Sequence, residues 1–209
     1  MKKSLLTLML SALMLGAFAQ GKMNELFKNN VKLIFMGYDL SQARFIGTDG
    51  FTDPAAIKDK FVAAWNNTFV AEYEKFSLQK AFKLTNDKYE TNVDVVQDIN
   101  GKLNIHERVM NGSYSIGEDD VKKAVSHYNS KEKDAVGLVY VVESFNKTLE
   151  KAVICVTFVD LSNNKVLYTE KVEEKAGGFG LKNYWIAPAT KLKKDIEGKY
   201  YKTWKNKFK

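Results

Sequence analysis

The chain has 209 residues, of which 45% are hydrophobic, 27% are charged and 12% are aromatic, with two prolines, one cysteine and a formal net charge of +7. These proportions exclude a disordered protein, a collagen-like protein and a small domain held together by disulfides. No linker rich in proline, glycine or serine divides the chain, and a body of this length buries enough surface to fold as one unit. We therefore expect a single domain over residues 20–209.

Residues 1–19 have the pattern of a secretory signal peptide. Two lysines precede a mostly apolar run over 5–15, and the small residues Ala17 and Ala19 match a cleavage site before Gln20. The apolar run is shorter than the roughly 20 residues that cross a membrane, and a retained N-terminal anchor is the alternative. Because no cysteine follows the cleavage site, lipid attachment there is excluded. The sequence predicts a periplasmic or secreted protein without a membrane span.

The first elements of the domain are a strand and a long helix. An apolar run over 31–36 predicts a strand that ends at Gly37. Asp53 and Pro54 are residue types that begin helices, because aspartate caps the first N–H groups and proline needs none there. Large apolar residues then recur every three or four positions, which predicts a helix with one face on the core. This stripe consists of Ile57, Phe61, Trp65, Phe69, Tyr73 and Phe76.

Residues 91–106 predict a weaker pair of strands. β-branched residues alternate over 91–96, Asn100-Gly101 is typical of a tight turn, and 102–106 is the expected hairpin partner. A short amphipathic helix is expected from Glu118, because three acidic residues lie in its first turn, where the helix dipole favours negative charge.

The C-terminal half carries the clearest strand patterns. The runs 135–145, 152–160 and 166–172 are rich in β-branched residues and are separated by turn residues, which predicts antiparallel hairpins. In the first two runs both alternating faces are apolar, as in strands covered on both sides. A last helix is expected from Pro188, with apolar residues at a spacing of four. The predicted fold is α/β, with one mixed sheet of about five strands, a C-terminal antiparallel hairpin pair and three main helices.

Few residue patterns in the sequence point to catalysis. The two histidines, His106 and His127, lie far apart, and neither belongs to a zinc-protease motif. Cys155 lies inside an apolar strand, which favours a buried thiol over a nucleophile. No Gly-x-Ser-x-Gly elbow is present, and the Gly-rich segment 177–180 lacks the lysine of a phosphate-binding loop. The prediction is a protein that is not an enzyme, with no catalytic residue, no metal site and no cofactor.

Two alternatives stay open beside this prediction. The loop 47–53 carries two aspartates and two glycines without the spacing of a calcium-binding EF-hand, and a cleft beside Asp49 would suit a small ligand or a polymer. A hydrolase would need two carboxylates that converge from distant parts of the chain, which a sequence does not reveal.

Three aromatic residues near the Gly-rich segment are candidate partner-binding residues. Phe179, Tyr184 and Trp185 either fold back onto the core or form an exposed contact patch, a role for which tyrosine and tryptophan are common. The last helix is the second candidate, because residues 191–209 hold eight lysines against Asp195 and Glu197. Such a helix either contacts an anionic surface weakly or keeps its lysines in solvent. Nucleic acid is not expected as a partner, since the chain has only two arginines.

The segment VKLIFMGYDLSQARFIG over 31–47, followed by FTDPAAIKDKF and AAWNNTF, resembles a group of secreted proteins of unknown function from Gram-negative bacteria. The last 75 or so residues, with VGLVYVVESF, AVICVTFVDLSNNKVLYTEKV and GGFG before a closing helix, resemble envelope modules more distantly. These modules occur in penicillin-binding-protein activator lipoproteins, in curli-secretion subunits and in the N-terminal domain of the Tol-system propeller protein. The resemblance implies a non-enzymatic module that binds an envelope protein partner.

Overall fold

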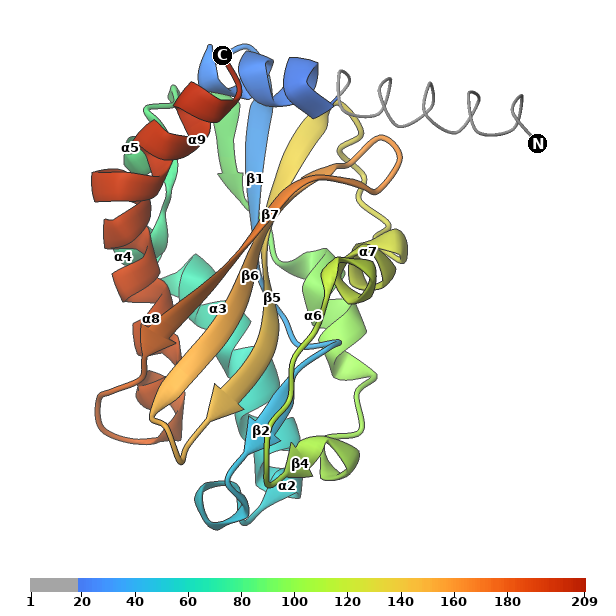
Figure 1. Ribbon diagram of the computed structural model, residues 1–209, viewed down its shortest axis with the longest axis vertical. Helices are drawn as coiled ribbons and strands as arrows, with labels where there is room; N and C mark the ends of the chain where they lie inside the picture. Colours follow the sequence, from blue (N-terminus) through green and yellow to red (C-terminus); the bar gives the residue numbers. More distant parts are fainter. Residues whose placement is uncertain (1–18) are drawn as a thin grey trace, which may run out of the picture.

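The computed structural model describes residues 19–209, so the predicted signal peptide, apart from Ala19, lies outside the described residues. A helix over 19–27 leads into one mixed β-sheet that has helices on both faces (Figure 1). This architecture confirms the predicted α/β class. In the part of the chain that is described, no helix is both long enough and apolar enough to cross a membrane.

The sheet is organised around one fully buried strand. β5 (Ala135–Asn146) lies parallel to β1 (Lys32–Asp39) along its first half and parallel to β2 (Arg44–Ile46) at its end. On its other edge β5 pairs antiparallel with β6 (Lys151–Asp160), which pairs with β7 (Lys165–Lys175). Two short strands, β3 (Tyr89–Thr91) and β4 (Val109–Met110), extend the sheet beyond β1 and β2. The three C-terminal strands and their hairpins are as predicted.

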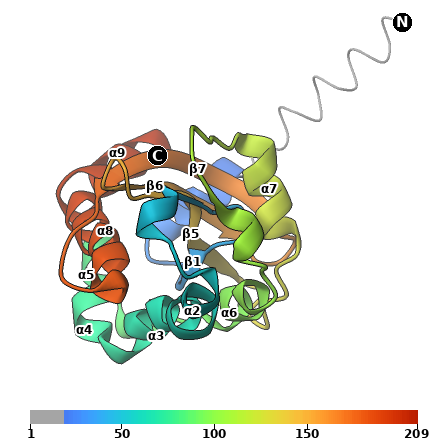
Figure 2. The ribbon, with the colours of Figure 1, turned by 90° about the horizontal axis from the view of Figure 1, so that it is seen from below.

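The two faces of the sheet are covered by different helices (Figure 2). One face carries α3 (Ala63–Ala71), α4 (Tyr73–Phe76), α5 (Gln79–Phe82), α8 (Leu181–Asp195) and α9 (Tyr201–Lys207). This face is densely aromatic: the ring of Phe145 stacks on that of Trp185 with 4.7 Å between centroids, and Phe158 meets Trp204 edge-on at 5.2 Å. The other face is more aliphatic and is covered over β6 and β7 by α7 (Glu118–Ser126), which begins where predicted. All three tryptophans are buried. The sheet is therefore a rigid support for the loops at its ends.

The long helix begins at the predicted cap. The Asp53 side chain accepts a hydrogen bond from the backbone N–H of Ala56 at 2.8 Å. The helical segment comprises α2 (Pro54–Ala56), a π-helical stretch η2 (Ile57–Val62) and α3 (Ala63–Ala71), followed by the short α4 (Tyr73–Phe76) and α5 (Gln79–Phe82). Tyr73 is exposed, so its prediction as a core residue is wrong. The helix breaks at Glu72, whose ψ of 46° redirects the chain and turns Tyr73 outward.

The predicted strand over 91–96 and its hairpin partner over 102–106 are wrong. After β3 the chain forms α6 (Asp94–Gly101), and His106–Arg108 is a short 3-10 helix, η4; another, η3, spans Asn86–Lys88. The side chain of Asn92 accepts a hydrogen bond from the Asp94 N–H at 3.1 Å, which helps to begin the helix. The alternation of valines is equally consistent with a helix whose buried side includes Val96 and Asn100.

The last helix begins earlier than its proline suggests. α8 (Leu181–Asp195) starts after Gly180 and contains Pro188 in its middle, and it continues through the π-helical η5 (Ile196–Tyr200) into α9 (Tyr201–Lys207). Proline has no N–H, so the carbonyl of Tyr184 lacks its usual helical donor. The N–H of Gly177 takes that place at 3.2 Å. The predicted start at Pro188 is wrong because the missing hydrogen bond is supplied from outside the helix.

Two buried asparagines bind the backbone at the end of β1. Asn66 accepts from the Tyr38 N–H at 2.7 Å and donates to the Tyr38 carbonyl at 2.9 Å, while Asn100 donates to the same carbonyl at 2.8 Å and accepts from the Leu40 N–H at 2.8 Å. The two amides thus act as a substitute for a neighbouring strand. Gly37 has a φ of +81°, and a Cβ there would lie 2.5 Å from the Asn66 oxygen, so glycine is required for this approach.

Candidate functional site

Three loops meet at one end of the sheet, which we call the loop end: residues 47–50, 146–150 and 176–180. In Figure 1 they lie at the lower end of the molecule, opposite the C-terminus. The Ala176 N–H donates to the Glu150 carbonyl at 2.8 Å, and the Lys147 N–H donates to the Ile46 carbonyl at 2.8 Å. The first loop contains the short 3-10 helix η1 (Thr48–Gly50). Because β5, β6 and β7 hold these loops, the loop end has a fixed geometry.

The loop end carries an outward-pointing phenylalanine. Phe179 is 96% exposed, and Leu149 in the adjacent hairpin turn is 60% exposed. Gly178 and Gly180 flank the phenylalanine with φ values of +103° and +77°, a region that favours glycine. The carbonyl of Phe179 accepts a hydrogen bond from the Asn183 side chain at 3.1 Å, which ties the loop to α8. Two large apolar side chains are therefore presented to solvent from neighbouring, anchored loops.

The structure does not bring the three predicted aromatic residues together. Trp185 is completely buried and stacks on Phe145, so its prediction as part of an exposed contact patch is wrong. It lies one residue after Tyr184 on α8 and faces the sheet, where its ring completes the aromatic core. Tyr184 is half-buried, and the Lys147 ammonium lies 3.8 Å above its ring. Phe179 is the one member of the trio that points fully outward.

Leu149 is the residue that sequence reasoning missed. It lies in the turn between the first two predicted C-terminal strands, close to the polar residues Asn146 and Lys147. A leucine beside such polar residues has no strand or helix to bury it, and this is the signal that would have identified it.

Hollows adjoin the loop end on one side. A pocket of about 330 Å³ is lined by Gly47, Thr48, Asp49, Asn111 and Lys147. It lies beside Asp49, where the alternative prediction of a ligand-binding protein expects a cleft. A second pocket, of about 360 Å³, lies on the α7 face of the sheet and reaches from Glu143 to Leu149. Both pockets are lined in part by Thr148. Of the two exposed apolar residues, Leu149 borders one of these pockets.

The acidic group at the floor of the second pocket is neutralised. Glu143 is buried and forms an ion pair with Lys171, and its carboxylate also accepts from the Ile116 N–H at 2.9 Å. A carboxylate that is bound on two sides in this way holds the 110–117 segment onto the sheet. This arrangement gives Glu143 a structural role.

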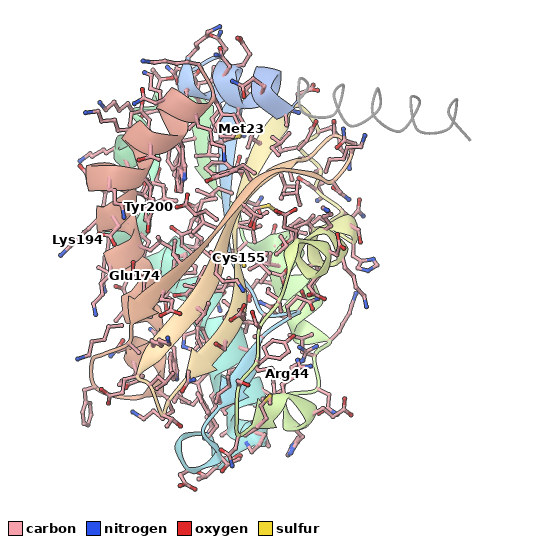
Figure 3. All side chains as sticks on the ribbon, viewed as in Figure 1. Met23, Arg44, Cys155, Glu174, Lys194 and Tyr200 are labelled. Carbon is pink, nitrogen blue, oxygen red and sulfur yellow. The ribbon has the colours of Figure 1, made fainter. Side chains whose placement is uncertain are left out.

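One pair of carboxyl groups converges, but it does so between β7 and α8. Glu174 is buried on β7 (Figure 3), and burial together with the carboxyl group of Asp195 raises the pKa of Glu174 from 4.5 to about 7. This is the kind of raised pKa that a general acid requires. Glu174 lines none of the pockets at the loop end, so the pair does not meet a substrate-sized hollow there.

The cysteine and the two histidines do not come together in one site. Cys155 is 3% exposed, and burial raises the pKa of its thiol to about 11. His106 and His127 are both exposed and belong to different segments. Within residues 19–209, no group of three or more His, Cys, Asp and Glu side chains is arranged to hold a metal ion.

Another hollow lies elsewhere, at the side of the sheet. It measures about 530 Å³ and has an apolar floor of Ile34 and Met36 beneath polar walls from α6 and from residues 129–132. Asp94, Asp98 and Glu132 give these walls a negative character. Its size is within the usual range for small-molecule sites.

In comparisons with protein-family models, with curated proteins and with solved structures, nothing matches this chain. A function for the protein therefore has to be inferred from its own residues.

Proposed function

We propose that this protein is a non-enzymatic binding protein of the cell envelope, and that its loop end docks a protein partner through Phe179 and Leu149. The observation that carries the proposal is the 96% exposure of Phe179. Burying a phenylalanine side chain is worth roughly 1.5–3 kcal/mol, and the folded chain leaves this free energy unused. A partner that covers Phe179 gains it on binding.

Several features support a protein as the partner. Large apolar residues surrounded by polar surface are typical centres of protein interfaces. Phe179 and Leu149 are presented by loops that hydrogen bonds hold in place, which lowers the ordering cost of binding. The predicted secretory signal and the resemblance to envelope modules point to a partner in the periplasm or outside the cell. We place the contact on Phe179 and Leu149, with the half-buried Tyr184 beside them.

Site-specific photocrosslinking in the native cell envelope tests this proposal. A photoreactive benzoylphenylalanine at position 149 is expected to give one discrete adduct with a protein, and Phe179→Ala is expected to abolish that adduct. Val70 provides the matched control, because it is a large apolar residue that is 49% exposed on α3, away from the loop end. The probe at position 70 is expected to give no such adduct, and Val70→Ala is expected to leave the adduct at position 149 unchanged.

Three outcomes contradict the proposal. The first is equal crosslinking from positions 70 and 149. The second is an adduct at 149 that persists at full yield in Phe179→Ala. The third is an adduct with lipid in place of protein, which would assign the loop end to a membrane surface.

A second candidate function is the binding of a small ligand or a polymer beside Asp49. The observation in its favour is the 330 Å³ pocket formed by residues 47–50, Asn111 and residues 147–148. Native mass spectrometry of the protein isolated from its own envelope tests it: a retained ligand that is lost in Asn111→Leu would favour this function over protein docking.

A further inference from the structure

The C-terminal helix carries a second exposed surface, which shares no residue with the loop end and extends from α8 to the C-terminus. The side of α8, η5 and α9 that faces solvent is lined by lysines, and we call it the basic face. Figure 3 shows Lys194 projecting outward from this helix. The members of the basic face are all exposed: Lys191, Lys194, Lys199, Lys202, Lys207 and Lys209.

The charge of the protein is concentrated on this helix. Residues 191–209 hold eight lysines against two acidic residues, whereas residues 19–190 hold 22 basic and 23 acidic residues. Two lysines in and directly after α5 add to this charge. The ammonium of Lys83, the residue after α5, lies 5.1 Å above the ring of Tyr201 on α9. The pKa of Lys193 is lowered mainly by its burial, and Lys80 of α5 is near enough to lower it further. Two elements thus contribute positive charge to one surface.

The lysines of this helix are not neutralised within the protein. Among the described residues, the ion pairs involve lysines of other segments, such as Lys75 with Glu72 and Lys122 with Asp119. Among residues 19–209, none of the eight lysines over 191–209 has its ammonium nitrogen within 4.0 Å of a carboxylate oxygen. Their positive charge is therefore available to an anionic partner.

The apolar side of the helix is already used by the fold. Leu192, Ile196 and Trp204 are completely buried, and Phe208 is 5% exposed. A helix that inserts into a bilayer needs a free apolar face, and this one has none to offer. Contact through the basic face must therefore be electrostatic and must stay at the level of charged headgroups.

We propose that the basic face binds peripherally to an anionic phospholipid surface. The helical part of the segment, residues 191–207, spans about 25 Å, and the exposed lysines are distributed over that whole length. An extended row of charge suits a continuous anionic surface better than a single small anion, which needs convergent donors. Near such a surface each lysine contributes roughly fivefold in affinity.

This inference goes beyond the protein-docking function, because it uses different residues at a different place. The helix over 19–27 lies beside the end of α9: the Asn24 side chain donates to the Phe208 carbonyl at 2.7 Å, and the Gln20 side chain donates to the Lys209 carbonyl at 3.1 Å. The chain preceding residue 19 therefore joins the molecule next to the basic face. For that reason the test uses the predicted mature form, which begins at Gln20.

Vesicle co-sedimentation tests the proposal. The mature protein is expected to bind vesicles of phosphatidylcholine with about one third phosphatidylglycerol and to release them when salt rises from about 0.1 to about 0.5 M. Vesicles of phosphatidylcholine alone are expected not to bind. The triple variant Lys194→Gln, Lys199→Gln and Lys202→Gln is expected to lose about a hundredfold in affinity, from the combined effect of three lysines.

The matched control removes the same amount of charge from elsewhere on the surface. The triple variant Lys60→Gln, Lys102→Gln and Lys133→Gln changes three exposed lysines outside the C-terminal helix and is expected to lose less than about fivefold. Unchanged circular dichroism and melting temperature verify that both variants fold. Three results would overturn the proposal: no binding to phosphatidylglycerol vesicles, an equal loss in the two triple variants, or binding to soluble polyphosphate in preference to vesicles.

Discussion

Replacing Glu174 by glutamine is expected to remove a pH dependence from the stability of the fold. Glu174 is 9% exposed on β7, and both burial and the neighbouring carboxyl group of Asp195 raise its pKa to about 7. Lys191 on α8 acts in the opposite direction. The buried Tyr38 and Tyr140 also lie near enough to sense the charge of Glu174, and burial is the main cause of their own raised pKa values.

The sign follows from the pKa of Glu174 in the two states. The carboxyl group has a pKa of 4.5 in the unfolded chain and about 7 in the folded protein, so the folded protein holds the proton more tightly. Its contribution to stability is fully present below pH 4.5 and is lost as the pH rises through about 7. A ratio of about 300 between the two dissociation constants corresponds to about 3 kcal/mol. Because Asp195 is exposed, solvent screening makes this figure an upper limit.

Urea unfolding followed by tryptophan fluorescence measures the effect at about pH 4.5 and about pH 8. Glu174→Gln is expected to match the wild-type free energy of unfolding at the lower pH and to exceed it by about 1–3 kcal/mol at the higher pH. The control variant Glu197→Gln removes an exposed acid two residues after Asp195, in the helical segment that continues α8. It is expected to show the wild-type pH dependence of stability. The reasoning is refuted if Glu174→Gln destabilises the protein equally at both pH values.

Two further predictions concern the buried polar groups. Asn66→Ala leaves the Tyr38 N–H without its acceptor and is expected to lower the free energy of unfolding by about 2 kcal/mol or more. The control Asn67→Ala, on the exposed side of α3, is expected to lower it by less than about 0.5 kcal/mol. Equal losses of the two variants in urea unfolding would contradict this prediction. The Cys155 thiol, with its pKa raised to about 11 by burial, is expected to resist Ellman's reagent in the native protein and to react fully once unfolded. Rapid labelling of the native protein would show that Cys155 is accessible.

The sequence predicted an element correctly where the spacing of its apolar residues fits only a strand or only a helix. The runs over 135–145, 152–160 and 166–172 contain apolar residues on both alternating faces or end at turn residues, and they form β5, β6 and β7. The segment over 91–96 was misread because its valines fit either period, and the start of the helix is helped by a hydrogen bond that the Asn92 side chain accepts from the Asp94 N–H.

Both long helices show a signal that is readable in the sequence but easily overlooked. Their apolar residues recur at a spacing of four, as in Ile57, Phe61, Trp65 and Phe69, whereas an α-helix turns every 3.6 residues. A strict spacing of four therefore drifts around an α-helix by about 40° per step. A wider π-helical stretch lies at 57–62, between α2 and α3, and another at 196–200, between α8 and α9. The wider turn compensates for this drift, so the apolar residues stay on the side that faces the sheet. The spacing of four predicts these stretches.

The candidate site was less predictable, because exposure depends on the whole fold. Trp185 and Phe179 are both aromatic residues near a Gly-rich loop, and only the path of α8 decides that one is buried and the other is not. Asn66 and Asn100 look like ordinary polar residues of two helices until the end of β1 passes between them. Such relations join parts of the chain that are more than 25 residues apart, and no local pattern records them.

The two proposed surfaces make separate physical demands, and this separation makes the pair informative. The loop end relies on two apolar side chains, so contact there should tolerate salt, whereas the basic face relies on lysines, so contact there should weaken with salt. In Figure 1 the loop end lies opposite the C-terminus, and the end of α9 lies beside the N-terminal helix. The basic face begins at Lys191, ten residues after the start of α8, so a membrane held on it uses none of the residues of the loop end. Protein crosslinking at the loop end should then persist when anionic vesicles are bound, because the two surfaces share no residue.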